Sequence, residues 1–275
     1  ADIGNTTYSI ASIAINPSNG DIYAGVSESY QCTDCGIFKS TDNGVTFNHV
    51  YENTNAQSAS YNHWEFTSDG DVFVTSTSYT PEALLKSSNG IDWTAVGSGL
   101  NFGLDLEINP VSMIITSTNR IIVSSTNYNT SDGVYQSLYA SDDNGTTWST
   151  IAVDTEAAQF HAGMVQDDDD IIYGFKYLSD SYPDTRQLGH QSSDDGENWT
   201  QIDETGITKD YDHSPECSHI SNSQYIYICT ENSGVWRTAD PVSVPDVDGC
   251  MDASACNYNA NATGDDGSCL YDDCA

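Results

Sequence analysis

Oxygen-bearing side chains near the C-terminus have the spacing of a calcium-binding loop. The ligands that this loop would offer are Asn257, Asn259, Asn261, Thr263 and Asp265. Their alternate positions suit Ca²⁺, which is bound through carboxylate, amide and other oxygens. The segment departs from the usual pattern, because Ala262 stands where glycine is preferred and Ser268 replaces the bidentate glutamate. Two interpretations stay open: a calcium site, or an asparagine-rich turn held by disulfides alone.

Cysteines offer a second kind of chemistry. Cys32 and Cys35 form a CxxC pair, but a metal site needs more ligands than one such pair supplies, so we expect a small loop-closing disulfide. Cys217 and Cys229 flank a predicted hairpin, and we expect them to pair across it if the geometry allows. The remaining four are Cys250, Cys256, Cys269 and Cys274. Four cysteines allow three pairings, and the sequence does not choose among them.

Acidic residues could cleave a sugar bond, since that reaction uses two carboxylates placed across it. The candidates on or beside predicted inner strands are Glu65, Asp105, Glu107, Asp212 and Glu216. The chain has 41 acidic residues, so some pair will always look suitable. We therefore expect these to be solvated acids near the mouth of a channel.

Histidines and tyrosines form two further candidate groups. The histidines on or near predicted inner strands are His63, His161 and His219, with His213 close in sequence. They could converge on a metal, but we expect them to fill the channel as hydrogen-bonded polar groups.

The tyrosines in predicted loops of one rim are Tyr30, Tyr79, Tyr128, Tyr177 and Tyr182. A tyrosine-lined rim suits contact with a sugar or a protein, and ordinary loop packing is the alternative.

The composition excludes several classes of partner. Seven Lys and Arg against 41 Asp and Glu give a formal net charge of −34. Nucleic acids and anionic membranes both attract basic surfaces, so neither is an expected partner. No stretch is long and apolar enough to span a membrane, and the cysteines indicate an oxidising compartment. We therefore expect a secreted protein, extracellular or on the cell surface, in salty surroundings that screen its charge.

One turn phrase recurs along the chain. Its copies begin at Ser40, Ser87, Ser141, Ser192 and Thr238, the second shortened and the last truncated. The Ser and Asp side chains at its head suit hydrogen bonds to backbone amides, and its glycine supplies a positive φ. The aromatic residue that closes it packs beneath the turn. The acids of these phrases are therefore expected to stabilise turns rather than bind metal.

Predicted strands surround each phrase. A hairpin precedes it, a third strand leads into it, and a fourth strand leaves it, as in Trp148–Val153. Four strands that repeat about every 50 residues are typical of propeller blades. We expect an all-β fold: a five-bladed β-propeller of four-stranded blades over residues 1–245, and a small disulfide-stapled module over residues 246–275.

The fifth unit lacks a complete phrase, so its outer strand must come from elsewhere. We expect the N-terminal segment to supply it, either in the same molecule or in a neighbour by strand addition. The residues that would make this assembly contact are Ile3, Tyr8 and Ile10.

The turn phrase resembles the Asp-box, or BNR repeat, most closely in Ser40-Thr41-Asp42-Asn43-Gly44-Val45-Thr46-Phe47. Asp-boxes occur in propellers of sialidases, sortilin-type receptors, xyloglucan-cleaving enzymes and photosystem-assembly factors. The resemblance implies a propeller, and because these families do unrelated things it implies no single function. Sialidases grip their substrate with an arginine triad. The arginines of this chain, Arg120, Arg186 and Arg237, lie in separate units, and the arginine-bearing N-terminal motif is missing.

The tail resembles a small cysteine module of secreted proteins of marine bacteria. The shared pattern is G-C-x-D-x-x-A-C-N-Y followed by D-D-G-S-C, and it covers residues 249–269. We expect a non-catalytic structural or adhesive protein that assembles into filaments or a surface layer through its terminal segments, as a homo-oligomer or self-polymer stabilised by calcium. A carbohydrate-binding propeller with glycan partners and a sialidase-like glycoside hydrolase are the alternatives.

Overall fold

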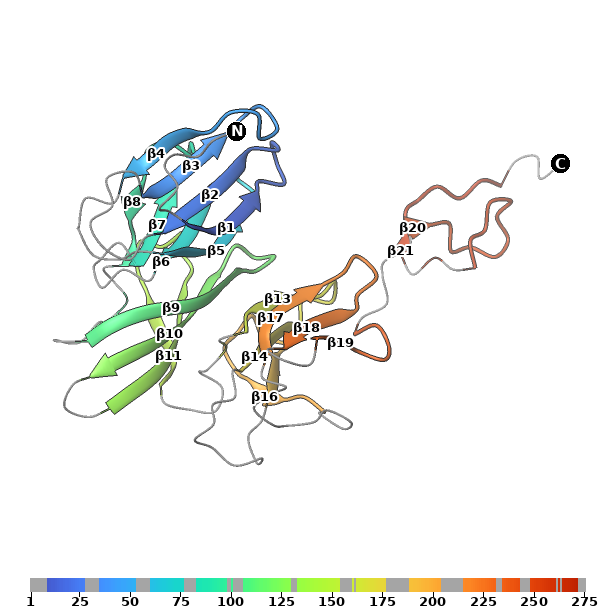
Figure 1. The fold of residues 1–275 in the computed structure, drawn as a ribbon. Helices are drawn as coiled ribbons and strands as arrows, with labels where there is room; N and C mark the ends of the chain where they lie inside the picture. The colour runs from blue at the N-terminus through green and yellow to red at the C-terminus, as the bar shows by residue number, and fades with distance from the viewer. Residues whose placement is uncertain are drawn as a thin grey trace.

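The fold is described from a computed structural model of the chain (Figure 1). The structure describes residues 9–27, 35–52, 60–76, 83–97, 100, 106–129, 133–153, 160, 162–176, 188–203, 215–230, 234–242, 248–260, 262 and 264–271. The named elements within these ranges are all β-strands. The expected all-β fold is therefore confirmed.

The strands form five antiparallel sheets, one for each predicted unit. Blade 1 holds β1 (Ser9–Ile15), β2 (Ile22–Ser27), β3 (Gly36–Ser40) and β4 (Asn48–Glu52). Blade 2 holds β5 (Tyr61–Phe66), β6 (Val72–Ser76), β7 (Leu84–Ser87) and β8 (Thr94–Ala95). Blade 3 holds β9 (Leu106–Ile115), β10 (Ile121–Asn129), β11 (Gly133–Ser141) and β12 (Ser149–Val153).

Blade 4 holds β13 (Met164–Gln166), β14 (Ile172–Phe175), β15 (Gly189–Ser192) and β16 (Thr200–Gln201). Among the described residues blade 5 has three strands, β17 (Pro215–Ile220), β18 (Ile226–Thr230) and β19 (Gly234–Arg237). Within every blade the strands pair in chain order. The first strands of successive blades lie side by side, β1 with β5, β5 with β9, β9 with β13 and β13 with β17, so the first strand of each blade is the innermost. The prediction of a five-bladed propeller is confirmed.

Apolar side chains between successive blades form the core. Tyr23 of blade 1 packs with Tyr61 and Val74 of blade 2, and Phe73 of blade 2 packs with Met113 and Val123 of blade 3. Similar clusters join blade 3 to blade 4 and blade 4 to blade 5. Strands alternate their side chains between two faces, so the same strand serves the core on both sides of its blade. The blades are therefore held together face to face.

Ile10 does not lie in the outer strand of blade 5, where the sequence predicted it. Ile10 lies in β1, opposite Val26 of β2, and therefore belongs to the innermost strand of blade 1. The prediction started from the missing outer strand of blade 5. In the structure, Ser9–Ile15 instead pairs with β2 and forms the first hairpin of blade 1. Ile3 and Tyr8 lie outside the described residues.

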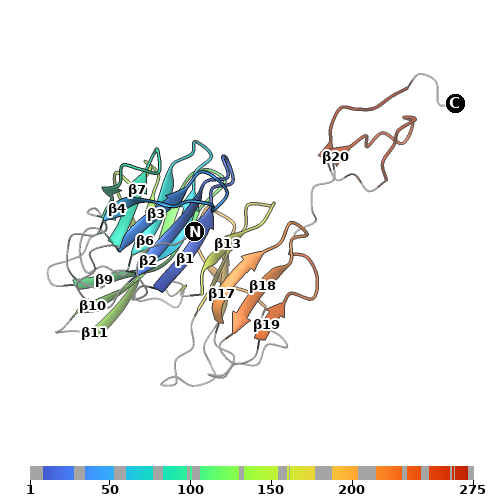
Figure 2. The ribbon, with the colours of Figure 1, turned by 45° about the horizontal axis from the view of Figure 1, so that its top comes forward.

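The tail stands apart from the blades in both views (Figures 1 and 2). Its two short strands, β20 (Asp248–Gly249) and β21 (Gly264–Asp265), pair in parallel. A disulfide joins Cys250 to Cys269. This bond selects one of the three pairing schemes that the sequence left open. In blade 5 a second disulfide joins Cys217 to Cys229, which lie opposite each other in β17 and β18 as predicted.

Gly196 and Gly234 offer a matched test of blade packing, because both have φ of +84°. A side chain in this conformation costs roughly 1–2 kcal/mol whatever its surroundings. At Gly196 a methyl group would also collide with the Cδ1 atom of Ile122 in blade 3, whereas nothing lies within 4 Å of it at Gly234. We predict that Gly196→Ala lowers the free energy of unfolding by roughly 2–4 kcal/mol, since overpacking adds to the backbone cost.

Urea denaturation of both variants measures the difference. Gly234→Ala is the control and should lose only the backbone contribution, about 1–2 kcal/mol. Equal losses in the two variants would contradict face-to-face packing of blade 4 on blade 3.

Candidate functional site: the box turns and their seats

The recurring phrases form hairpin turns with one hydrogen-bond pattern, and we call them box turns 1 to 4. They span residues 40–47, 87–93, 141–148 and 192–199. In box turn 1 the Ser40 hydroxyl donates to Asp42 Oδ1 at 2.8 Å and accepts from the Gly44 amide at 2.9 Å. The Asp42 carboxylate accepts from the Thr46 amide at 2.8 Å and from the Thr46 hydroxyl at 2.6 Å. The turn therefore satisfies its own polar groups.

Box turns 3 and 4 repeat this pattern with Asp143 and Asp194 as the central acids. Asp143 accepts from the Thr147 amide and hydroxyl, and Asp194 from the Asn198 amide and side chain. In box turn 2, Asn89 takes the place of the acid and accepts from the Asp92 amide at 2.8 Å. The carboxylates thus serve the turns, as the sequence indicated.

Hydrogen bonds lower the pKa of the central acids. The Thr46 hydroxyl and amide, with the Ser40 hydroxyl, lower the pKa of Asp42 to about 2. The corresponding groups of Thr147 and Asn198 lower the pKa of Asp143 and of Asp194. Because these donors favour the charged form, the three carboxylates stay ionised well below neutral pH.

Box turns 2, 3 and 4 also pack against the blade before them, on a surface that we call the seat. A seat consists of three equivalent positions: the residue before the second strand, the second residue of that strand, and the last residue before the box turn. The seats are Asp21, Tyr23 and Lys39 in blade 1; Asp71, Phe73 and Lys86 in blade 2; Arg120, Ile122 and Ala140 in blade 3; Ile171, Tyr173 and Gln191 in blade 4; and Tyr225, Tyr227 and Arg237 in blade 5.

A cation binds an acid and an aromatic ring in the first two seats. Lys39 Nζ lies 2.9 Å from Asp21 Oδ2 and 5.5 Å from the centroid of the Tyr23 ring. Lys86 Nζ makes the equivalent contacts, 2.7 Å from Asp71 and 5.5 Å from the Phe73 ring. Each pair is mostly shielded from solvent, so its attraction is screened less than that of a surface pair.

In box turns 2, 3 and 4 the residue before the glycine hydrogen-bonds to the preceding blade. Lys39 Nζ donates to the Asn89 carbonyl at 3.1 Å, and Asn144 Nδ2 donates to Asp71 Oδ2 at 2.7 Å. At the next joint the Thr118 hydroxyl donates to Asp195 Oδ2 at 2.7 Å. The three joints therefore use one position of the box turn for the same purpose.

Arg120 is the basic residue in the seat of blade 3, and it pairs with acids of two box turns. Its guanidinium pairs with Glu197 of box turn 4 and lies 3.4 Å from Asp142 of box turn 3. It borders a polar cavity of about 220 Å³, which Asp69, Asn119 and Asn144 also line. Arg120 therefore bridges two blades. Arg237 lies in blade 5, and Arg186 is outside the described residues.

Glu65 is the candidate inner-strand acid whose side chain lies within the described residues. It lies in β5 opposite Phe73, and the backbone of Ile115 in β9 hydrogen-bonds its carboxyl. Burial between these two blades raises the pKa of Glu65 to about 8, which the hydrogen bond offsets only in part. The carboxyl is therefore mostly protonated at neutral pH. Asp105 and Asp212, and the side chains of Glu107 and Glu216, lie outside the described residues.

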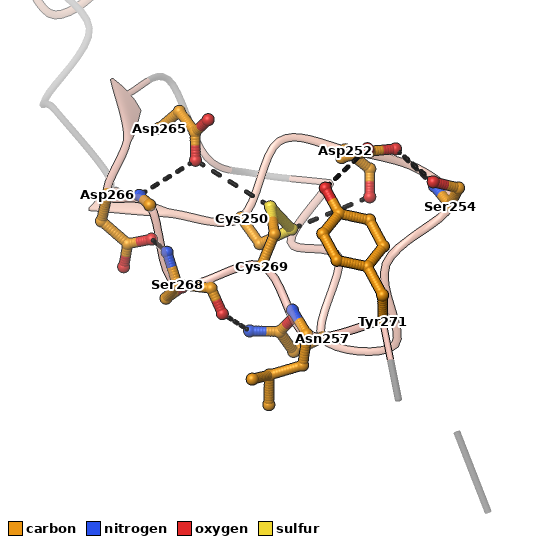
Figure 3. Close-up of a disulfide and its surroundings, with 11 residues drawn as sticks. Cys250, Asp252, Ser254, Asn257, Asp265, Asp266, Ser268, Cys269 and Tyr271 are labelled. Carbon is orange, nitrogen blue, oxygen red and sulfur yellow. Dashed lines mark hydrogen bonds between the residues drawn. A yellow bond between two sulfur atoms is a disulfide. The ribbon is translucent and has the colours of Figure 1, made fainter. Parts of the chain in front are cut away.

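The tail loop uses part of its predicted calcium ligands for its own turns (Figure 3). The Asn257 side chain donates to the Ser268 carbonyl and accepts from the Leu270 amide, both at 2.8 Å. The Asp265 carboxylate accepts from the Gly267 amide, and the backbone N–H of Asn259 donates to the Cys250 carbonyl at 2.9 Å. Asn261 and Thr263 lie outside the described residues, so calcium binding stays a prediction.

Other candidates are placed only in part. His63 lies in β5 and His219 in β17, where His219 is exposed, while His161 and His213 lie outside the described residues. The described ranges hold no group of three or more His, Cys, Asp or Glu side chains arranged for a metal. The tyrosine rim, Tyr30, Tyr79, Tyr177 and Tyr182 with the side chain of Tyr128, falls outside them.

The remaining cysteines agree with an oxidised protein. Cys35 and Cys256 are both disulfide-bonded, while Cys32 and Cys274 lie outside the described residues. The part of the chain that the structure describes contains no helix with the length and apolarity needed to cross a membrane.

The seat cations were missed at the sequence level, although a signal was present. A basic residue directly precedes the first residue of three phrases, in Lys39-Ser40, Lys86-Ser87 and Arg237-Thr238. In a chain with only seven Lys and Arg, this repetition marks the seats.

Comparison with known proteins supports the fold. No protein-family model and no curated protein matches the chain. A Dyadobacter fermentans protein of unknown function matches with a TM-score of 0.57 at 16% identity, over 85% of this chain and 79% of that one. A Hadza microbial sialidase matches with a TM-score of 0.57 at 11% identity, over 87% of this chain and 59% of the sialidase. A Xanthomonas campestris GH74 xyloglucanase matches with a TM-score of 0.55 at 13% identity, over 84% of this chain and 36% of the xyloglucanase.

These likenesses lie at low identity, so they concern the fold and not the activity. The chain spans about three fifths of the sialidase and about a third of the xyloglucanase. The structure is thus similar to sialidase-type propellers.

The pKa of Asp42 tests the bonding within a box turn. We predict that Thr46→Val raises this pKa from about 2 toward its ordinary value of 3.8, because the hydroxyl donor is lost. A depressed carboxyl pKa stabilises the fold above pH 4, and this contribution disappears as the pH falls toward 2. Carbon-detected NMR titration of the aspartate carboxyls measures the shift. Thr41→Val, in the same turn, is the control, and an Asp42 pKa that is equal in all three proteins would count against the pattern.

Glu65 gives stability a pH dependence of the opposite sign. Its pKa is about 8 in the fold and 4.5 in the reference state, so the folded protein keeps a proton that the unfolded chain releases between these values. The stabilisation is present below pH 4.5 and is lost as the pH rises through 8. We predict that Glu65→Gln gains roughly 2–4 kcal/mol over wild type between pH 4.5 and 8. Denaturation curves at several pH values test this, with the exposed Glu52→Gln as a control that should show no such trend.

Proposed function

We propose that this protein is a non-catalytic extracellular structural or adhesive protein that self-assembles through its end blades. The observation that carries the proposal is the exposed apolar face of β1. Ile10, Ile13 and Ile15 expose 50%, 60% and 61% of their surfaces. Contiguous exposed apolar residues mark interaction surfaces in soluble proteins.

Disulfides support an extracellular setting. Cys217–Cys229 and Cys250–Cys269 are formed in the structure, and disulfides persist in oxidising compartments. The net charge of −34 keeps separate molecules soluble and opposes their association at low ionic strength. In high salt the repulsion between molecules is screened, so the apolar face of β1 can bind a second molecule. Calcium bound to the acidic surface or to the tail would act in the same direction.

A glycoside hydrolase is the second candidate, because Glu65 has the protonation that a general acid requires near neutral pH. An acid with a raised pKa protonates the leaving oxygen of a glycosidic bond, while a second carboxylate acts from the other side. Glu65→Gln would abolish hydrolysis of a glycoside substrate if this candidate were correct. A sugar-cleaving activity that is unaffected by the substitution would remove Glu65 from the reaction.

Self-assembly should depend on ionic strength. We predict the mass of a single 29.8-kDa chain at about 0.01 M salt, where charges repel over about 30 Å, and multiples of it above 0.5 M, where repulsion is short-ranged. Light scattering over a concentration series measures the mass, with and without a calcium chelator. The control, Ile91→Asp, replaces a residue with similar exposure (56%) at the tip of box turn 2 and should assemble normally. Monomers at every salt concentration would contradict the proposal.

A further inference from the structure

Three joints in the fold follow one rule: the box turn of each blade sits on the seat of the blade before it. Gly90 covers the Tyr23 hydroxyl so closely that a methyl group would collide with it. Gly145 lies against the Phe73 ring, and Gly196 lies against Ile122. All three glycines are buried, and Tyr23, Phe73 and Ile122 beneath them expose 1% or less. Box turns 2, 3 and 4 and the seats of blades 1, 2 and 3 are therefore matched surfaces.

The seat of blade 5 has no box turn on it among the described residues. Arg237 stacks over the Tyr225 ring at 4.3 Å, and Tyr227 lies opposite Arg237 in the register. Tyr227 is half-buried and Arg237 is exposed, unlike their buried counterparts Tyr23 and Lys39. Beside them Val235 exposes 66% of its surface. This seat presents a cation, two aromatic rings and an apolar side chain to solvent.

Box turn 1 is the corresponding unmatched box turn. Gly44 is only half-buried, and the atoms nearest to it belong to Ile22 and Phe47 of its own blade. Asn43, at the position that fastens the other box turns, makes no hydrogen bond to another blade in the described ranges. Ser12 of β1 hydrogen-bonds to Tyr61 and Trp64 of blade 2, so the exposed Ile13 and Ile15, which alternate with it, face away from blade 2. Ile15 lies opposite Ile22, the residue nearest to Gly44.

The two unmatched surfaces are complementary. The seat of blade 5 carries Arg237, which has no acidic partner in the part of the chain described, whereas box turn 1 offers the Asn43 carbonyl beside the ionised Asp42. At the equivalent joint between blades 1 and 2, Lys39 donates to the Asn89 carbonyl. Apolar side chains lie on both surfaces, namely Val235 on one and Ile13 on the other.

We propose that the seat of blade 5 binds box turn 1 of a second copy of this chain. The chain's own blade 1 is not the occupant, because Val235 on the seat side and Ile13 beside box turn 1 expose 66% and 60% of their surfaces within the single molecule. The joint is head-to-tail, with different surfaces on the two partners, so it generates rings or open filaments. The inference rests on the proposed self-assembly and adds to it the two surfaces that meet.

A mixing experiment tests the joint with full-length protein in high salt. Val235→Asp places a charge on the seat of blade 5, and Ile13→Asp places one on the face beside box turn 1. Because both residues are exposed, the variants should fold, and circular dichroism and melting curves verify this. We expect each variant alone to remain monomeric in light scattering. Mixed one to one, the intact seat of one variant and the intact box turn of the other should form a dimer of two chains that grows no further.

Other results would overturn the joint in distinguishable ways. If wild type assembles and Val235→Asp assembles equally well, self-assembly stands but the seat of blade 5 is not its surface. Monomeric variants that form no dimer on mixing would show that the contact is not head-to-tail. If wild type is a monomer at all concentrations and both variants melt at lower temperature, blade 1 covers the seat within one chain, and the assembly proposal fails too. The control Ile91→Asp should match wild type throughout.

Discussion

Contact between a box turn and the preceding seat is the interaction on which the remaining structure depends. A four-stranded blade exposes two faces, and neither can stay in water without cost. The box turn adds a rigid polar edge to the apolar face, because Asp143 and its equivalents hold the hairpin through internal hydrogen bonds. Its glycine lets the backbone approach the seat closely, and the aromatic residue that follows enters the core between blades, as Trp148 does. Turn, seat and core are thus one unit.

Local features could be predicted from sequence because their causes are local. Ser40, Asp42 and Gly44 form the turn through bonds that span no more than four residues, and the repeat period indicated the number of blades. The partners in a joint are far apart in sequence, as Tyr23 and Gly90 are, so no turn rule connects them. The pairing of Cys250 with Cys269 was equally undetermined, since all three pairings fitted the spacing.

The site was less predictable than the fold for the same reason. The raised pKa of Glu65 arises from burial between β5 and β9, which belong to different blades, and nothing near Glu65 in the sequence indicates it. Ile10 was expected in the outer strand of blade 5 because the fifth repeat is incomplete, whereas the structure pairs it with Val26 in blade 1. The seat cations were visible as a repeated basic residue, but their role required the acid and ring beside them.

The central claim is that the seat of blade 5 and box turn 1 are matched between molecules. Hydrogen–deuterium exchange at low and high protein concentration, in high salt, tests it most directly. The account predicts that backbone amides of residues 226–237 and 36–47 gain protection together as concentration rises, while residues 84–95, whose joint is internal, do not change. Exchange that is independent of concentration in both segments, or protection confined to one of them, would contradict it.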